Sequence, residues 1–145
     1  MAEEKEAPDY LKVLYEENAT MFRFFLTWRQ RLLPGFFAVL AAIVLGYRWA
    51  LPNAPNMSCV LPFIGAGASA LFWALDLRNR QLYRHASLAG SKLESSMGLA
   101  ETGFYGTYRE ARSWIRHSVI LSILYLGCCF LFLLLGILTC AGIFR

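Results

Sequence analysis

The stretch of sequence that decides the fold is residues 119–144, which read VILSILYLGCCFLFLLLGILTCAGIF. It holds no charged side chain, and the next residue that carries a charge is Arg145. A helix needs about 20 apolar residues to cross the hydrocarbon core of a bilayer. This stretch is therefore predicted to be a transmembrane helix, and it is the clearest one in the chain.

Two further apolar blocks predict that the chain crosses a membrane three times. The first spans residues 32–51 and is interrupted only by Arg48, whose long side chain can reach the headgroups from the end of a helix. The second spans residues 58–75. Between them, residues 52–56 read PNAPN, and this density of proline and asparagine predicts a tight turn between antiparallel helices.

Basic residues are distributed unevenly about these three spans. Twelve of the 14 Lys and Arg lie either before the first span or between the second and third. Because Lys and Arg are concentrated in cytoplasmic segments, the N-terminus is predicted to be cytoplasmic and the C-terminus periplasmic or extracellular. The net charge of +4 would also fit a soluble nucleic-acid-binding protein. Membrane topology explains it without a further assumption.

Residues 8–30 are predicted to form an amphipathic helix on the cytoplasmic side. Two interpretations of this helix are open, one in which it lies on anionic lipid and one in which it packs against neighbouring subunits. A mixture is favoured, with the aromatic half at the membrane surface. The prediction rests on apolar residues that recur mostly at steps of three, four or seven, namely Leu11, Leu14, Tyr15, Phe22, Phe25 and Leu26.

Residues 76–117 are predicted to form a cytoplasmic helical hairpin. In its first arm, span two continues as a helix through Glu94, and Gly98, Gly103 and Gly106 mark the break that follows. The second arm, residues 108–117, leads directly into span three. With the N-terminal helix, these parts make residues 1–145 a single membrane domain of the all-α class.

A basic stripe on this second arm is the main candidate for a ligand site. Arg109, Arg112 and Arg116 fall at i, i+3 and i+7, which places them on one face of a helix. Arginine binds phosphate with two parallel hydrogen bonds, and aromatic rings stack on bases. From the residues alone, topology and pairing with acids or anionic lipid are favoured over ligand binding. The full candidate set for phosphate or nucleic acid is Arg109, Arg112, Arg116, Arg78, Arg80, Arg84, Tyr108 and Trp114.

Small residues in span two predict a surface on which helices pack closely. Gly65 and Ser69 form a small-x-x-x-small pattern, and Gly67 lies between them. In lipid such a surface lets another helix or another subunit approach closely. The span is thus a candidate for contacts within a homo-oligomer.

The four cysteines favour a packing role over a chemical one. There is no C-x-x-C pair, and no histidine stands at metal-ligand spacing from a cysteine, so no metal site is expected. The favoured interpretation is that the cysteines are small apolar packing residues. Cys59 and Cys140 are both predicted near the non-cytoplasmic surface, and a disulfide between them is the alternative.

Groups with catalytic spacing are missing from the sequence. The two histidines, His85 and His117, lie among arginines without an evident nucleophile or carboxylate at a chemical spacing. No glycine-rich phosphate loop is present, because Gly65-x-Gly67 lies within a span. We therefore expect neither an enzyme nor a bound cofactor.

Two pieces of the sequence resemble small bacterial membrane effectors of antiphage defence. They are residues 15–29, from YEEN to FFLTWR, and residues 72–84, which read FWALDLRNRQLYR. The chain is most similar to SLATT-like effectors and to the membrane effector of the Hailong system. The third span is a departure, since two-span effectors of this broad class end differently.

The resemblance implies a self-associating protein of the bacterial inner membrane that permeabilises the membrane when a ligand is released. In the Hailong-like form, the inhibitory ligand is single-stranded DNA or a nucleotide made by a partner nucleotidyltransferase. Membrane lipid and further copies of the chain would be its other partners. The alternative is a non-conducting membrane scaffold or accessory subunit of a larger complex.

Overall fold

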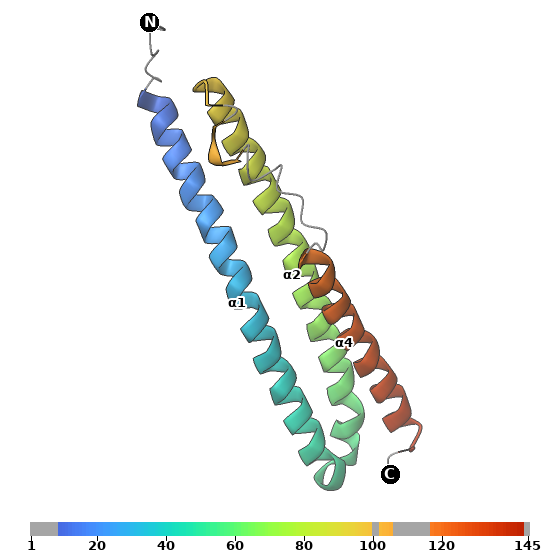
Figure 1. Ribbon diagram of the computed structural model, residues 1–145. Helices are drawn as coiled ribbons and strands as arrows, with labels where there is room; N and C mark the ends of the chain where they lie inside the picture. The colour runs from blue at the N-terminus through green and yellow to red at the C-terminus, as the bar shows by residue number, and fades with distance from the viewer. Residues whose placement is uncertain (1–8, 100–101, 106–116, 144–145) are drawn as a thin grey trace, which may run out of the picture. The chain divides into compact units, whose positions relative to one another are not determined.

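Three long helices make up most of the protein. The computed structural model describes residues 9–99, 102–105 and 117–143, and this part of the chain contains helices and no strand. The helices are α1 (Asp9–Asn53), α2 (Pro55–Ser96) and α4 (His117–Cys140), as Figure 1 shows. All three are long and apolar enough to cross a membrane. The predicted all-α protein with three membrane-spanning helices is confirmed at this level.

The helices α1 and α2 are longer than a bilayer requires. They contain 45 and 42 residues, which at about 1.5 Å per residue makes each about 65 Å long. The hydrocarbon core of a bilayer is only about 30 Å thick, so about half of each helix lies outside it. The described part of the predicted helix 8–30 and the predicted span 32–51 both belong to α1, and α2 continues past residue 75 as predicted.

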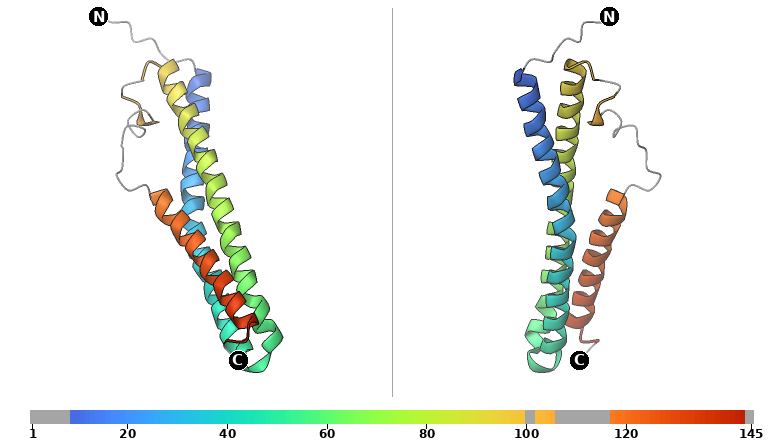
Figure 2. Two further views of the ribbon diagram at one scale, coloured as in Figure 1. Left: turned by 90° about the vertical axis from the view of Figure 1, so that its right-hand side faces the viewer. Right: turned by 60° about the vertical axis from the view of Figure 1, so that its left-hand side comes forward.

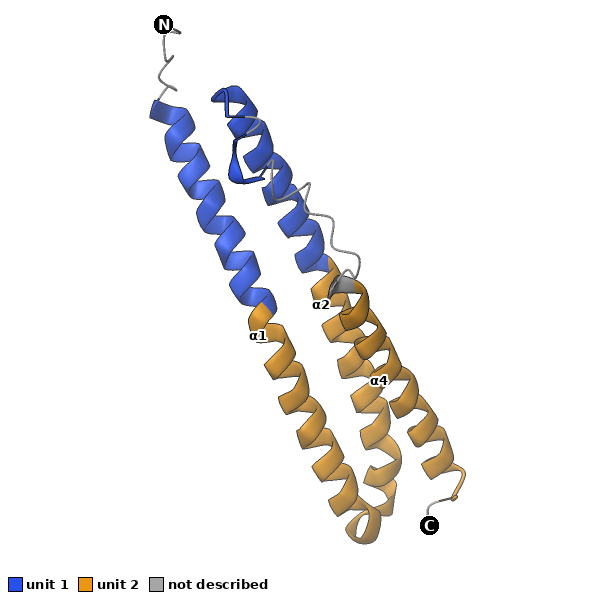
Figure 3. Cartoon of the chain, in the orientation of Figure 1, with its two compact units in different colours: residues 1–29, 78–114 blue, residues 30–77, 115–145 orange. Residues whose placement is uncertain are grey.

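The chain divides into two compact units along these helices (Figure 3). Unit 1 consists of Met1–Arg29 and Arg78–Trp114, and unit 2 of Gln30–Leu77 and Ile115–Arg145. The boundary in α1 falls at Gln30, one turn before Pro34, which has no N–H to donate to the carbonyl of Gln30. The two parts of α1 therefore meet where its hydrogen-bond ladder is interrupted.

The turn between α1 and α2 is tighter than the sequence predicted. Only Ala54 separates the helices, because Pro52 lies in the last turn of α1 and Pro55 begins α2. Proline suits the first position of a helix, where its missing N–H would have no partner within the helix. The side chain of Asn53 donates to the Trp49 carbonyl at 2.7 Å and so satisfies one carbonyl at the end of α1.

Glycines in the left-handed conformation end the other two helices. Gly98 has φ +77° after α2, and Gly142 has φ +80° after α4. The Leu99 N–H donates to the Glu94 carbonyl at 2.8 Å, and the Ile143 N–H to the Leu138 carbonyl at 3.2 Å. These are Schellman caps, which need a residue without a Cβ at this position.

Aromatic rings fill the centre of unit 2, where parts of α1, α2 and α4 lie side by side (Figure 2). Phe36 and Tyr125 are fully buried and meet edge to face, with ring centroids 4.8 Å apart. Leu121 belongs to the same cluster, and Phe72 packs against it from α2. The interior between the three helices is thus occupied by side chains.

Glycine and phenylalanine interlock between α2 and α4 in unit 2. A Cβ added at Gly65 would come within 2.8 Å of the Phe132 ring, and one added at Gly136 within 3.0 Å of the Phe63 ring. On each of the two helices, a glycine therefore contacts a phenylalanine ring of the other helix. Ser69 is fully buried and donates its hydroxyl to the Gly65 carbonyl at 2.9 Å, so it presents no free polar group there.

Gly67 differs from its two neighbours in the predicted packing set. It is exposed, and an added Cβ would meet no atom within 4 Å. Within the chain, the small-residue surface therefore consists of Gly65 and Ser69. A role for Gly67 between subunits stays a prediction.

Gly65→Ala and Gly67→Ala form a matched pair that tests this packing. Gly65→Ala should lower the free energy of unfolding by about 1–3 kcal/mol, because the Phe132 ring would have to move. Gly67→Ala should leave it unchanged or raise it by up to about 1 kcal/mol through helix propensity. Unfolding in mixed detergent by increasing sodium dodecyl sulfate, followed by tryptophan fluorescence, measures both. Equal effects of the two variants would contradict the packing.

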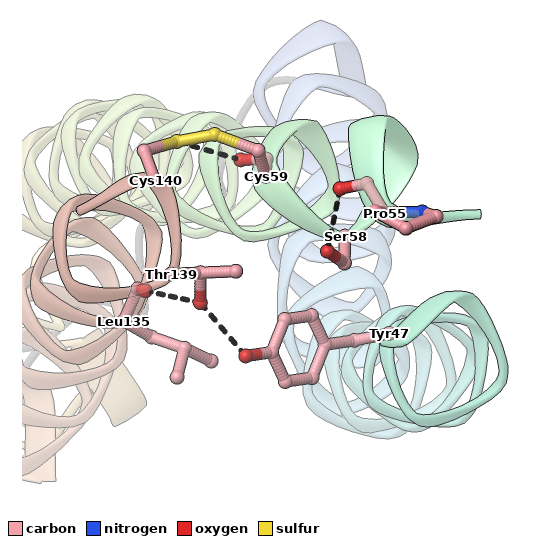
Figure 4. Close-up of a disulfide and its surroundings, with 7 residues drawn as sticks. All are labelled: Tyr47, Pro55, Ser58, Cys59, Leu135, Thr139 and Cys140. Carbon is pink, nitrogen blue, oxygen red and sulfur yellow. Dashed lines mark hydrogen bonds between the residues drawn. A yellow bond between two sulfur atoms is a disulfide. The ribbon is translucent and has the colours of Figure 1, made fainter. Parts of the chain in front are cut away.

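A disulfide joins Cys59 of α2 to Cys140 at the end of α4 (Figure 4). The two Cα atoms are 5.3 Å apart, within the range that a disulfide allows. For this pair the disulfide alternative therefore replaces the interpretation as packing residues. The same end of unit 2 holds a hydrogen bond of 2.8 Å between the hydroxyls of Tyr47 and Thr139. Cys128 and Cys129 remain free thiols, both half-buried.

Alkylation of denatured, unreduced protein tests the bridge. Only Cys128 and Cys129 should react before reduction, and Cys59 and Cys140 should react after it. Intact mass spectrometry counts the added groups. Cys59→Ser is the control, because it should release Cys140 and give a third reactive thiol without reductant. Four reactive thiols in unreduced wild-type protein would contradict the bridge.

Candidate functional site

Unit 1 is held together by a regular seam between α1 and α2. On each helix the inward-facing residues recur at steps of three or four, which is the spacing of helices that pack knobs into holes. The inward residues of α1 are Leu11, Tyr15, Asn18, Phe22 and Phe25, and those of α2 are Asn79, Tyr83, Ala86, Gly90 and Glu94. Of the eight candidates predicted to bind phosphate or nucleic acid, the structure describes three, Arg78, Arg80 and Arg84, and all three lie on this part of α2.

Phe22 is the centre of the apolar part of this seam. It is buried, with its ring centroid 4.7 Å from that of Tyr83 and 5.2 Å from that of Tyr105, the latter edge to face. Aromatic pairs in such arrangements are more stable than their buried area alone implies. The cluster therefore joins α1, α2 and residues 102–105, which follow α2 in the sequence.

Two polar side chains cross the same seam. Asn18 donates to the Ala86 carbonyl at 3.1 Å, and Asn79 donates to the Phe25 carbonyl at 3.3 Å. Both bonds connect a side chain of one helix to the backbone of the other. Since a buried amide is costly without a partner, these bonds favour one register of α1 against α2.

Glu94 is a buried carboxylate at the end of this seam. Only 1% of it is exposed, and its Oε1 accepts a hydrogen bond of 3.1 Å from the Tyr15 hydroxyl and one of 2.9 Å from the Tyr105 N–H. Such bonds offset the cost of removing a carboxylate from water. Glu94 thereby fixes the position of Tyr105. Burial in turn raises the pKa of the Tyr105 hydroxyl above its ordinary value.

Two glycines leave room for this arrangement. A Cβ at Gly90 would come within 2.5 Å of the Tyr105 ring, and a Cβ at Gly103 would collide with the Glu94 carboxylate. Gly90 lies inside α2, before its last turn, where glycine lowers helix stability by about 1 kcal/mol relative to alanine. The close approach of the Tyr105 ring is a physical reason for a glycine at this position.

The predicted basic set is brought together only in part. Arg80 and Arg84 are four residues apart and share one side of α2, with Arg80 half-buried and Arg84 exposed. Arg78 is exposed on a different side of the helix, as its spacing from the other two requires. The remaining candidates lie outside the described residues: Arg109, Arg112, Arg116, Tyr108 and Trp114.

Sequence reasoning missed the cluster of Tyr15, Glu94 and Tyr105. Tyr15 and Glu94 are 79 residues apart, and no local pattern connects them. One available signal was Glu94 itself, an acid that directly follows Leu93 at the end of the predicted first arm. Among the described residues, no group of three or more His, Cys, Asp or Glu could hold a metal ion.

No family model, curated protein or solved structure matches this chain. The resemblance to antiphage effectors therefore stays a prediction. What the chain does has to be argued from its helices, its charge distribution and the two units described above.

Tyr15→Phe tests the hydrogen bond to the buried carboxylate. Loss of the hydroxyl leaves Glu94 with one fewer donor, so the free energy of unfolding should fall by about 1–3 kcal/mol. Tyr10→Phe is the matched control, because Tyr10 is exposed on the same helix. The detergent unfolding assay described above compares the two. A control as destabilised as Tyr15→Phe would show that the bond does not stabilise unit 1.

Proposed function

We propose that the chain is an effector of bacterial antiphage defence that oligomerises in the inner membrane. It forms a pore and depolarises the membrane when an inhibitory single-stranded DNA or nucleotide is released. The observation that carries the oligomeric part is the filled interior of unit 2. Phe36 and Tyr125 are fully buried between the three helices, so a pathway for ions needs several copies around a common axis.

The proposed orientation places the N-terminus in the cytoplasm and the C-terminus outside. Two independent features support it. Twelve of 14 basic residues lie on the side assigned to the cytoplasm. The Cys59–Cys140 disulfide lies in the last turn of α4 and near the start of α2, at the opposite ends of these helices from the basic segments. Disulfides persist in the periplasm and outside cells, and are rare in the cytosol.

The proposed ligand is a polyanion that binds the basic set on the cytoplasmic side. Arg109, Arg112 and Arg116 directly precede His117, where α4 begins. A ligand held there would act on residues that are continuous with a membrane-spanning helix. The anchoring of Tyr105 by Glu94 supports this role, because it fixes one end of the connection that carries these arginines.

Titration with fluorescein-labelled oligo(dT) tests the proposed ligand. The wild-type protein in detergent should bind it, more weakly at higher salt. Arg112→Glu with Arg116→Glu should weaken binding at least tenfold and reduce the slope of log affinity against log salt by about 1.4, because about 0.7 is lost per phosphate contact. Lys12→Glu reverses one charge on α1, outside the proposed set, and should bind as the wild type does.

Binding that is indifferent to the arginine variants would overturn the nucleic-acid form of the proposal. A potential-sensitive dye in cells tests the pore separately. Expression without the inhibitory ligand should depolarise the membrane. An unchanged membrane potential would instead favour the non-conducting scaffold, the alternative function.

A further inference from the structure

The helix α1 has a second row of side chains at the spacing of a helix–helix seam. Each of its first five members directly precedes a residue of the inward seam, so the row lies next to the seam on the surface of α1. Its members recur at alternating steps of four and three. The row consists of Tyr10, Leu14, Glu17, Met21, Phe24 and Trp28. All six are exposed, including Met21 at 62% and Phe24 at 60%. We call this row the outer stripe.

A groove runs along the outer stripe within unit 1. Its volume is about 410 Å³, and α1 and α2 form its two walls. Leu14 and Met21 line the wall from α1, and Ala89 and Leu93 line the opposite wall. Glu17 and Lys92 also line the groove, and they carry opposite charges on its two sides. Its shape and apolar lining suit a further helix, as in other helix-in-groove contacts.

The outer stripe indicates a helical partner and not a lipid surface. A lipid-facing helix repeats its apolar residues at nearly the same period, so the position of the stripe along α1 decides between the two. The stripe begins at Tyr10, about 22 residues before the first predicted span, a distance of about 33 Å along a helix. Most of it therefore lies beyond the reach of the hydrocarbon.

We propose that the outer stripe docks against a second copy of this chain. Copies in one membrane share an orientation, so their α1 helices run parallel and present the same face. A two-fold axis along the membrane normal then places the stripe of each copy in the groove of the other, an isologous contact. Glu17 of one copy faces the wall of the other that holds Lys92, and this pairing offsets the approach of the two Glu17 side chains that the same axis brings together.

This inference concerns assembly and deepens the oligomeric part of the proposed function. It assigns the contact between subunits to unit 1 and leaves the lining of a pore undefined. It also does not require that the assembly conducts ions. A non-conducting scaffold would use the same surface, so the two proposals can fail independently.

Disulfide trapping in native membranes tests the contact. The background carries Cys128→Ala and Cys129→Ala, which removes the free thiols and keeps the Cys59–Cys140 bridge. In it, Met21→Cys should form a covalent dimer upon copper phenanthroline oxidation, because equivalent stripe positions approach each other across the axis. Leu88→Cys is the control, a site on α2 outside the groove, and should remain monomeric.

A second pair of variants measures the strength of the contact. Leu14→Glu should raise the concentration for half-maximal association in detergent at least tenfold. Leu88→Glu should leave it within twofold of the wild type. The two leucines are closely matched in exposure, at 45% and 47%, so neither substitution buries a charge in the monomer. Analytical ultracentrifugation reports the association.

The outcomes separate the two proposals. Trapping at Met21 with an unchanged membrane potential would support the contact and reject the pore. Depolarisation without trapping at Met21, or with equal trapping at Leu88, would reject the contact and leave the pore standing. A wild-type protein that stays monomeric in membranes would overturn both the contact and the oligomeric effector.

Discussion

The thickness of the bilayer is the constraint on which the rest of this structure depends. In α1 and α2 only about half of the residues can lie in hydrocarbon, while both helices continue without a break for more than 40 residues. The side chains of each helix must therefore suit hydrocarbon over one part of its length and a polar environment over the rest. The division into two units follows this requirement, since each unit combines a different half of α1 with a different half of α2.

Different physical interactions stabilise the two units. In the proposed membrane arrangement unit 2 lies in lipid, where apolar side chains gain little by leaving the solvent and close contact supplies the stability. The pairing of Gly65 with Phe132 and of Gly136 with Phe63 is contact of this kind. Unit 1 instead buries Phe22 among other rings and places Glu94 among hydrogen-bond donors.

Much of the fold could be predicted because the relevant signals are local. A charge-free stretch is sufficient to locate α4, and the PNAPN turn is sufficient to make α1 and α2 antiparallel neighbours. The continuity of α1 was missed because the basic and aromatic residues 21–31 resemble a separate interfacial segment. Composition changes sharply there, but the backbone hydrogen bonding of a helix does not depend on composition.

The candidate site was harder to predict because its contacts join residues that are far apart in the sequence. The hydrogen bond between Tyr15 and Glu94 joins residues that are 79 positions apart. It depends on the register of antiparallel helices, which a shift of one turn would change. For the predicted arginine stripe, the sequence pattern is clear and the structure does not test it. Arg109, Arg112 and Arg116 lie outside the described residues.

The Cys59–Cys140 bridge also limits how unit 2 can move. It joins α4 to α2 at the last residue of α4, so the two helices cannot slide past one another along their axes by a helical turn. The bridged end acts as a pivot, whereas the other end of α4 is held by the packing of Leu121 and Tyr125 and not by a covalent bond. Any opening between these two helices in the oxidised protein is therefore a scissor motion, widest on the side where the chain enters α4.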